Sequence, residues 1–394
     1  MSKQDNKKTT KAGKIKKRFS EKPLWYKIFI ISAVIIIVIL LGLVGYAYHL
    51  MTLVNYDDTS DDTISPTDYI ETVENPEDYT HLPTATLEEI ESNGEEGRSI
   101  KGIYNLLLLG LDKDSGNLSD AIIVVTIDTK NKSLKLTSFM RDMLVQIPGY
   151  SNNKLNTAYG KGGAKLIYDV FATNFDLKLD GYVAVNFSSL AKVIDTLGGV
   201  SVYMTEKEAH YLNTTNYIAD EASRNLEEFT GTHWLNGSQA VGYARVRHVE
   251  KGSEADDFAR TTRQRQILNS IYEQFRNQSL PDLLNTMETV LPLVTTDLTL
   301  MEMTKIATDA VGAGILSADI EQFRIPIANS YTDSWYNKML VIDVDFKLNN
   351  REIHEFIFGS VPDEFKDEEE IEKSSIEEEE ERKENDSTTS TKKK

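Results

Sequence analysis

The chain has 394 residues, of which 40% are apolar, a formal net charge of −19 and no cysteine. The lack of cysteine excludes disulfide bonds, thiolate catalysis and cysteine-ligated metals. The acidic balance argues against nucleic acid as a partner, because nucleic acid binds basic surfaces. The length suits one large globular domain with extensions, or two small domains.

The first 50 residues predict a membrane anchor. Residues 1–27 form a basic cytoplasmic tail with ten lysines and arginines against two acids, and residues 28–50 form an apolar run without charged side chains. About 20 apolar residues span the hydrocarbon core of a bilayer, and the excess of positive charge keeps the N-terminus in the cytoplasm. We favour this uncleaved anchor over a cleaved signal peptide, because no small-residue cleavage motif follows the run. The expected location is the cell membrane, single-pass, with the C-terminal domain outside the cell.

Two polar segments flank the expected domain. Residues 51–99 are rich in acids, threonine and serine and contain three prolines, which is typical of an extracellular stalk. Residues 362–394 form an acidic tail, with 14 acids against 4 basic residues between positions 363 and 386. Such a tail cannot bury enough apolar area to offset the entropy cost of ordering, so we expect it to be disordered.

Regular structure is expected over residues 100–361. Residues 103–110 and 121–127 are continuous apolar runs of strand length, a pattern typical of strands buried on both faces. Further strands are expected at residues 133–139, 182–186, 200–204, 322–325 and 339–342, and helices at residues 164–175, 188–197, 237–245, 257–276, 280–291, 299–311 and 349–358. This alternation predicts an α/β fold with a central mixed sheet flanked by helices on both faces, preceded by a single transmembrane helix.

Carboxylates stand at the adjoining ends of the first two strands. Asp112 follows the first strand and Asp120 precedes the second. If they converge at one rim of the sheet, they suit Mg²⁺, which takes oxygen ligands and keeps water molecules that a substrate phosphate can replace. The alternative is a plain acidic turn, since aspartate and glycine are common turn residues.

A basic cluster stands out in this acidic chain. Its members are Arg245, Arg247, His248, Arg260, Arg263, Gln264 and Arg265, with Asp257 as the expected N-cap of the helix. The i, i+3, i+4 spacing of Arg260, Arg263 and Gln264 predicts that they share one helical face. Converging guanidinium groups beside a helix N-terminus suit a multiply charged anion such as a phosphate. The alternative is a helix face that pairs with surface acids.

A third charged element closes the third strand, where Arg141 is followed by Asp142. At the rim that carries Asp112 and Asp120, this arginine would face the anion. The alternative is a local salt bridge at a strand terminus, which contributes about 0–1 kcal/mol when exposed.

Together these elements resemble the LytR-CpsA-Psr family of Gram-positive cell-envelope proteins. The match has a motif core at residues 105–268. Its segments are 105–112 (NLLLLGLD), 119–120 (SD), 141–142 (RD), 154–160 (KLNTAYG) with glycines 162 and 163, 185–187 (VNF), 195–200 (DTLGGV), 235–240 (LNGSQA), 243–247 (YARVR) and 257–264 (DFARTTRQ). The expected topology agrees with the family pattern of a short cytoplasmic tail, one membrane helix and an outer catalytic domain.

The resemblance implies a Mg²⁺-dependent phosphotransferase. It would move a glycopolymer, such as wall teichoic acid or capsular polysaccharide, from a polyprenyl-pyrophosphate carrier to the muramic acid 6-hydroxyl of peptidoglycan. In the family pattern Asp112 and Asp120 hold Mg²⁺, and Asp257 orients the arginines. The residues that grip the pyrophosphate would be Arg141, Arg245, Arg247, Arg260 and Gln264, and the catalytic set would be Asp112, Asp120, Arg141 and Asp257. The lipid tail would lie in an apolar channel, and Asp112, Asp142 and Asp257 are candidates for the general base, in that order.

One departure from the family pattern concerns Leu118. The family commonly has arginine at this position, so one pyrophosphate-facing cation is missing unless Lys113 or another cation replaces it. The departure keeps a second function open, a non-catalytic polyprenyl-phosphate-binding envelope regulator or transcriptional attenuator. Hydrolysis of the pyrophosphate, with water as acceptor, is a third. A direct DNA-binding regulator is disfavoured, because only 27 residues are expected inside the cell.

Overall fold

The computed structural model describes residues 45–46, 48–50, 52–57, 97–112, 118–252, 254 and 256–366. The chain divides into two units, Met1–Leu53 and Val54–Lys394. In the first, the described residues up to Leu50 are helical, and Thr52 Oγ1 donates a hydrogen bond to the His49 carbonyl at 2.7 Å. Most of the expected anchor, residues 28–50, lies outside the described residues. Within the described part, the structure has no helix both long and apolar enough to cross a membrane.

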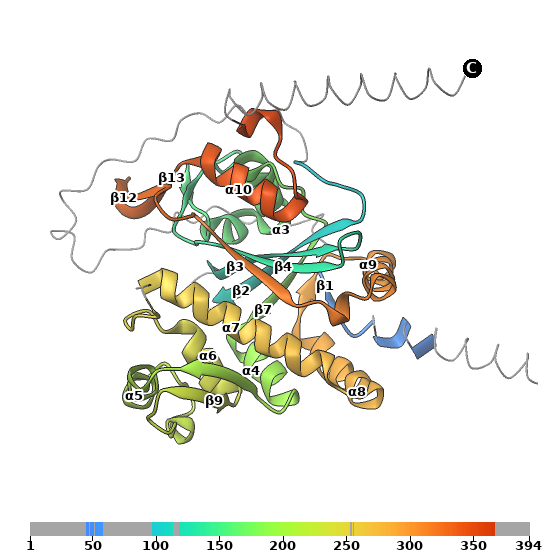
Figure 1. The fold of residues 1–394 in the computed structure, drawn as a ribbon, viewed down its shortest axis with the longest axis vertical. Coiled ribbons are helices and arrows are strands. Elements are labelled where there is room, and N and C mark those ends of the chain that lie inside the picture. Colours follow the sequence, from blue (N-terminus) through green and yellow to red (C-terminus); the bar gives the residue numbers. More distant parts are fainter. Residues whose placement is uncertain are drawn as a thin grey trace, which may run out of the picture. The chain divides into compact units, whose positions relative to one another are not determined.

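The second unit is built on a mixed seven-stranded sheet with the order β1-β10-β7-β2-β3-β4-β11 (Figure 1). Its strands are β1 (Asn55–Tyr56), β2 (Ile103–Asp112), β3 (Leu118–Asp128), β4 (Ser133–Phe139), β7 (Gly181–Asn186), β10 (Thr295–Thr296) and β11 (Ile320–Ile325). Strands β2, β3 and β4 are antiparallel neighbours, whereas β7 runs parallel to β2 and β11 runs parallel to β4. The predicted central mixed sheet is therefore confirmed.

One face of the sheet carries the main hydrophobic core. Helices α3 (Thr157–Phe175) and α10 (Phe346–Phe358) cover this face (Figure 1). Buried side chains of the strands, such as Leu107 and Leu109, join Phe171 of α3 and Ile353 of α10 in one cluster. Removing this much apolar surface from water is the main stabilising contribution to the unit.

Helices on the other face cover the sheet less completely. They are α4 (Phe187–Thr196), α7 (Asp256–Arg276) and α9 (Leu300–Ala313), while α8 (Leu280–Val290) packs against α4. As a result β2 alternates between buried residues and half-buried ones, of which Leu106 and Leu108 are examples. The prediction that this strand is buried on both faces is wrong, because an apolar run does not report how tightly the covering helices pack.

A smaller cluster packs beside the sheet. It joins the antiparallel strands β8 (Val200–Met204) and β9 (Gly231–Leu235) to helices α4, α5 (Glu206–Thr214), α6 (Gly237–Arg245) and α7. The remaining elements are β5 (Leu144–Val145), β6 (Asn153–Lys154), β12 (Tyr331–Tyr336), β13 (Met339–Val344) and the 3₁₀ turns η3 (Glu221–Ser223), η4 (Leu291–Leu293), η5 (Ile315–Ser317) and η6 (Asp363–Phe365). The expected helices and strands all occur. Those at residues 133–139, 200–204 and 237–245 have the predicted ends and the others have shifted ends, and α5, β9 and β12 are the longest elements that the sequence pattern missed.

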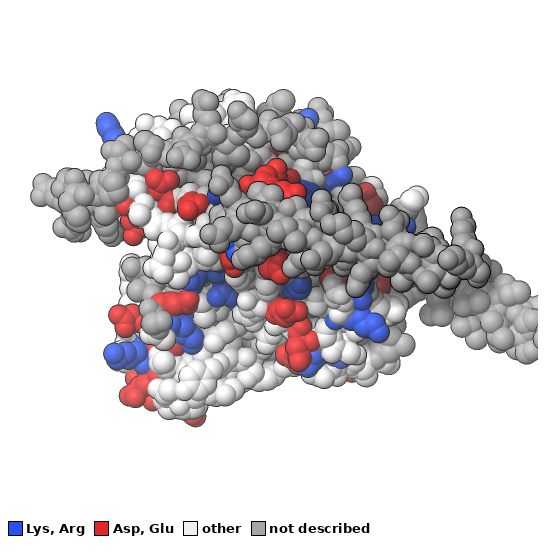
Figure 2. Space-filling view, turned by 45° about the horizontal axis from the view of Figure 1, so that its top comes forward, with Lys and Arg blue, Asp and Glu red and all other residues white. Residues whose placement is uncertain are grey.

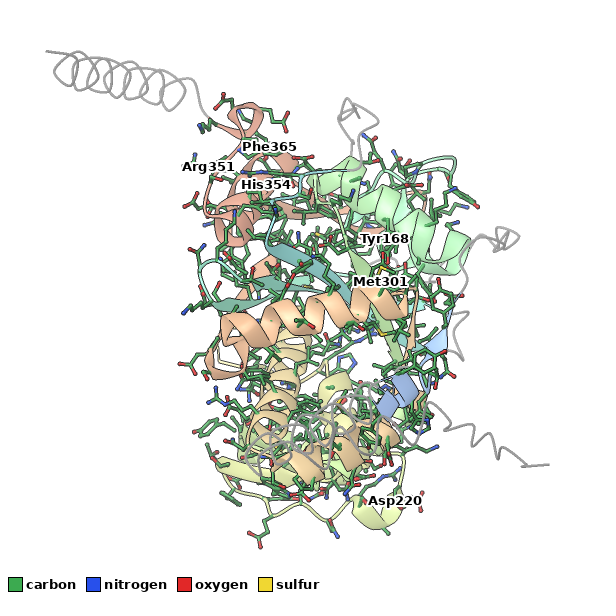
Figure 3. All side chains as sticks on the ribbon, turned by 90° about the vertical axis from the view of Figure 1, so that its right-hand side faces the viewer. Tyr168, Asp220, Met301, Arg351, His354 and Phe365 are labelled. Atoms are coloured by element: carbon green, nitrogen blue, oxygen red, sulfur yellow. The ribbon has the colours of Figure 1, made fainter. Side chains whose placement is uncertain are left out.

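The ends of the domain differ from the expected boundaries. Asn55 and Tyr56, which fall within the expected stalk, pair with β10, and the Asn55 side chain donates to the Pro292 carbonyl at 2.7 Å. At the other end, Phe365 of η6 lies beside His354 of α10, with ring centroids 5.1 Å apart (Figure 3). Both segments extend the folded unit beyond residues 100–361, while residues 58–96 and 367–394 lie outside the described residues.

Candidate functional site

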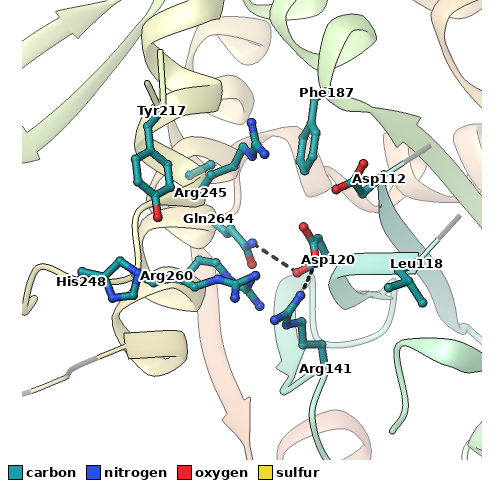
Figure 4. Close-up of a pocket in the computed structure, with 12 residues that line it drawn as sticks. Asp112, Leu118, Asp120, Arg141, Phe187, Tyr217, Arg245, His248, Arg260 and Gln264 are labelled. Carbon is teal, nitrogen blue, oxygen red and sulfur yellow. Dashed lines mark hydrogen bonds and ion pairs between the residues drawn. The ribbon is translucent and has the colours of Figure 1, made fainter. Parts of the chain in front are cut away.

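A cavity of about 240 Å³ opens at the end of the sheet where β2 and β3 meet (Figure 4). We call it the arginine cavity, and its wall consists of Asp112, Leu118, Asp120, Arg141, Phe187, Tyr217, Ala244, Arg245, Arg247, His248, Arg260 and Gln264. The structure thus brings together all the residues predicted to bind the metal or the pyrophosphate. Asp257 lies behind the wall in contact with its arginines, whereas Arg263 and Arg265 of the basic cluster do not line the cavity. Of the residues that sequence reasoning did not assign to the site, Phe187 lies in a quoted motif, whereas nothing in the sequence pointed to Tyr217.

Asp120 owes its position to an irregularity in the sheet. Ala121 pairs with Gly110 and Ser119 pairs with Leu111, so Asp120 is an extra residue in β3 without a partner in β2. Such a bulge twists a strand locally and redirects the extra side chain. Asp112, at the end of β2, lines the same cavity. The two carboxylates therefore converge at one rim, as the sequence predicted.

Helices α6 and α7 supply the opposite wall. Asn236 and Gln239 form a capping box that starts α6, and the helix ends at Arg245, where a cation also suits the helix dipole. The Arg245 guanidinium lies 4.5 Å from the centre of the Phe187 ring. Among the residues that the structure describes, no carboxylate lies within ion-pair distance of Arg245. Figure 4 shows Arg245 and Arg260 on one side of the cavity and Asp112 on the other.

Asp257 ties three arginines together. Its Oδ2 atom lies 2.9 Å from Arg260 Nη2 and 3.2 Å from Arg141 Nε, and its Oδ1 atom lies 3.5 Å from Arg247 Nε. Arg141 also reaches Asp120, with 2.6 Å between Nη1 and Oδ1. Burial raises the pKa of Asp120, but the charges of Arg260 and Arg141 outweigh this and hold that pKa below its usual value. Asp120 is therefore ionised at neutral pH.

Asp142 belongs to the same network but stands behind Arg141. Its carboxylate lies 3.3 Å from Arg141 Nε and 3.0 Å from the Nζ atom of the buried Lys154. Burial raises the pKa of Asp142, yet Arg141 and Lys154 together hold it well below its usual range. In the sequence Lys154 stands out only as part of a motif, because a single lysine does not show that it is buried beside an acid.

The wall of the arginine cavity is positive in an acidic chain. Four arginines against two aspartates leave a formal charge of +2, whereas the whole chain carries −19. On the described part of the face in Figure 2, basic and acidic side chains are interspersed rather than forming a broad basic surface. Burial lowers the pKa of Arg260 to about 10, so the guanidinium still stays charged at neutral pH. Its Nε atom is buried and has no hydrogen-bond partner among the described residues, which is costly unless a ligand supplies one.

Arg263 does not share the cavity with Arg260 and Gln264, contrary to the prediction from helical spacing. Its side chain is fully buried and its Nε atom lies 2.8 Å from Glu208 Oε1. Adjacent positions on a helix differ by about 100° in direction, so Arg263 and Gln264 can turn to different sides of α7. The i, i+3, i+4 spacing therefore does not show that all three side chains of such a set enter the same cavity.

An apolar strip leads away from the cavity along the less covered face of the sheet. Leu106 and Leu108 of β2 pair with Val125 and Ile123 of β3, and Leu108 also pairs with Val183 of β7. All except Ile123 are half-buried. The strip ends at Gly110, two residues before Asp112. Strand β2 thus carries incompletely covered apolar side chains along its length and Asp112 of the positive cavity at its end.

Known proteins are similar to this chain over much of its length. The model of the LytR_cpsA_psr family matches residues 71–350. "Regulatory protein MsrR" of Staphylococcus aureus is 33% identical over 242 residues, which cover 59% of this chain and 67% of MsrR. "Polyisoprenyl-teichoic acid–peptidoglycan teichoic acid transferase TagV" of Bacillus subtilis is 33% identical over 183 residues, which cover 45% of this chain and 44% of TagV.

Solved structures share the fold. The structure of TagT bound to LIIa-WTA has a TM-score of 0.52 at 23% identity, covering 71% of this chain and 98% of that one. The crystal structure of Bacillus subtilis TagV has a TM-score of 0.50 at 26% identity, covering 67% and 100%. The family match spans well over half of the chain and agrees with the motifs and the fold. The chain belongs to the LytR-CpsA-Psr family.

Proposed function

We propose that this chain is a membrane-anchored phosphotransferase that attaches a glycopolymer of the wall teichoic acid or capsular polysaccharide type to peptidoglycan. The donor would be the glycopolymer on a polyprenyl-pyrophosphate carrier. The observation that carries the proposal is the arginine cavity, with its formal charge of +2, at the end of a half-buried apolar strip. The similarity to TagV, which is described as a teichoic acid transferase, supports it.

The arginine cavity suits the two linked phosphates of such a donor. Guanidinium groups bond phosphate oxygens in a planar fork, and Arg141, Arg245, Arg247 and Arg260 approach from several directions. Gln264 adds an amide, which lies 3.5 Å from the Asp120 carbonyl. The apolar strip would accept the first isoprene units of the lipid, because burying them there covers side chains that the protein leaves half-exposed.

The residues present fit a Mg²⁺ ion. Asp112 and Asp120 line one cavity, and Asp120 is ionised at neutral pH. The described residues contain no group of three His, Cys, Asp or Glu side chains placed to hold a metal. A two-carboxylate site nevertheless suits Mg²⁺, which commonly takes its other ligands from substrate phosphates and water. When bound, the ion would neutralise phosphate oxygens and help to orient the donor.

The transfer itself would join a peptidoglycan hydroxyl to the phosphate that bears the glycan. The new oxygen–phosphorus bond forms as the bond between the two phosphates breaks, and polyprenyl phosphate leaves. Four arginines would balance the charge that develops on the leaving phosphate. The hydroxyl proton needs an acceptor. Asp112 is the best placed of the three candidates, because it lines the cavity whereas Asp142 and Asp257 do not.

A second function, a non-catalytic envelope regulator that holds polyprenyl phosphate, is favoured by two observations. Leu118 stands in the cavity wall where the family commonly has an arginine, and it is 6% exposed. The similarity to a protein described as regulatory, MsrR, points the same way. Such a regulator would bind the lipid phosphate without transferring the glycan.

Transfer can be tested with the full chain in detergent micelles. The assay supplies a lipid-pyrophosphate-linked glycan, peptidoglycan and Mg²⁺, and measures both the polyprenyl phosphate released and the glycan joined to the wall. Asp120→Ala and Arg260→Ala should abolish transfer, whereas Arg276→Ala, near the far end of the same helix, should not. Tight donor binding without transfer would support the regulator, and phosphate products without wall linkage would show hydrolysis. Full turnover by both cavity variants would show that the site assignment is wrong.

A further inference from the structure

A second ionic cluster lies within the smaller hydrophobic core and does not line the arginine cavity. Glu208 and Arg263 are both fully buried, and their Oε1 and Nε atoms are 2.8 Å apart. Lys251 Nζ approaches the other oxygen of Glu208 at 3.3 Å. Burying such charges is costly even when they are paired, so an ion pair of this kind adds little stability over a well-packed apolar core. The pair therefore calls for a reason other than stability.

The remaining donors of Arg263 show what that reason is. Nη1 donates to the Val246 carbonyl at 3.0 Å, and Nη2 donates to the Val249 carbonyl. Between these two carbonyls stand Arg247 and His248, both of which line the arginine cavity. One guanidinium thus holds both ends of the short loop that presents two cavity residues.

Glu208 is itself fixed by helix α5. It is the third residue of the helix and forms a capping box with Thr205, whose N and Oγ1 atoms donate to Glu208 Oε2 at 2.8 and 2.9 Å. The start of one helix therefore fixes Glu208, Glu208 fixes Arg263, and Arg263 fixes the loop that carries Arg247. An arginine suits this position because its planar fork can satisfy one carboxylate and two carbonyls at once. A lysine could keep the charge pair but would not reproduce this geometry.

We propose that Arg263, oriented by Glu208, is a positioning residue that sets the backbone of residues 246–249, and thereby aims Arg247 and His248 into the arginine cavity. Its consequence for the lipid-pyrophosphate donor rests on the proposed function, but its effect on the loop does not. The competing explanation is that the pair only stabilises the smaller core. The two explanations predict different results when Arg263 is replaced. If Arg263 positions the loop, residues 246–249 loosen more than the loss of core stability alone would cause; if it only stabilises the core, they do not.

The test compares Arg263→Lys and Arg263→Met with Ile267→Ala in the full chain. Ile267 lies one turn further along α7 and is 1% exposed in the same core, so its truncation lowers stability without touching the loop carbonyls. The first measurement is amide hydrogen exchange of residues 246–252 in the ligand-free protein. Both Arg263 variants should raise exchange there at least tenfold over Ile267→Ala, with Arg263→Met the greater. Exchange equal to that of Ile267→Ala would overturn the proposal.

The second measurement is binding of geranylgeranyl pyrophosphate with Mg²⁺. If Arg247 is aimed by Arg263, losing that contact should weaken binding roughly tenfold in Arg263→Lys, and an added Arg247→Ala change should then cost little more. Faster amide exchange with an unchanged affinity for the probe would show that Arg263 does not position Arg247 for binding. A wild-type chain that does not bind the probe would instead count against the proposed function, and the exchange result would still decide the role of Arg263.

Discussion

Replacing Asp257 by asparagine is the sharpest test of how the arginine cavity is held together. The change keeps the shape of the side chain but removes the carboxylate that Arg141, Arg247 and Arg260 share within 2.9–3.5 Å. Burial and the charge of Asp142 raise the pKa of this carboxyl against the pull of Arg260, so the cluster holds it at a cost. Arg260 is 3% exposed, so its charge cannot turn to water. Removing one partner of a buried ion pair costs about 3–5 kcal/mol. Taking the lower figure, because asparagine still accepts a hydrogen bond, we expect Tm to fall by roughly 6–12 °C.

Geranylgeranyl pyrophosphate should restore part of that loss. Its phosphates would replace the missing negative charge between the arginines, so the rise in Tm on adding the probe should be larger in Asp257→Asn than in the wild type. The assay is thermal unfolding with and without the probe, and Asp319→Asn, whose side chain is 97% exposed, is the control. An unchanged Tm in the ligand-free variant would refute the neutralising role of Asp257. An equal probe-induced rise in both proteins would show that these arginines do not contact the anion.

Three further outcomes follow from single features of the structure. Leu118→Arg should bind geranylgeranyl pyrophosphate roughly tenfold more tightly, because the arginine adds one charge-assisted donor to the cavity wall. Leu118→Met, the control for side-chain size, should leave the affinity unchanged. Chelation of divalent cations should stop transfer without lowering the Tm of the ligand-free chain, and retained transfer would contradict a metal site at Asp112 and Asp120. Burial lowers the pKa of His354 to about 4, so the unfolded chain binds the proton first and the stability that depends on neutral His354 is lost as pH falls from 6.5 towards 4. The free energy of unfolding, measured by denaturant titration at each pH, should fall by about 1.4 kcal/mol per pH unit in that range. His354→Gln should remove this pH dependence.

Much of the fold could be predicted because long periodic segments carry their own signal. Helix α7 and strands β2 to β4 have patterns that extend over at least seven residues, and the structure has each of them close to the expected range. Two-residue strands such as β1 and β10 carry no such pattern, since their pairing depends on partners distant in the chain. For this reason the start of the folded unit at Asn55 could not be found from composition.

The candidate site, like the fold, has features that follow from the local sequence and features that depend on residues distant in the chain. Residue types and spacing offered the aspartates and arginines of the cavity as candidates beside the alternatives of an acidic turn and a surface-paired helix face, and the family resemblance assigned them to one site. The bulge that redirects Asp120 and the turn of Arg263 towards Glu208 could not be predicted. Both depend on register and on which buried acid is nearby, and neither leaves a pattern in the local sequence.

The cavity wall is positive while the chain as a whole is negative, so salt should change how fast an anionic donor reaches the cavity. At 0.01 M salt charges act over about 30 Å, so an anion would feel much of the net charge of −19, whereas at 0.15 M they act over about 8 Å and the cavity, with +2, dominates. Association of geranylgeranyl pyrophosphate should therefore become faster between these salt concentrations, the opposite of what a broadly basic protein shows. Stopped-flow measurement of the association rate with the full chain decides this. A rate that falls steadily with added salt would mean that long-range attraction, rather than short-range contact with the arginines, brings the anion to the site.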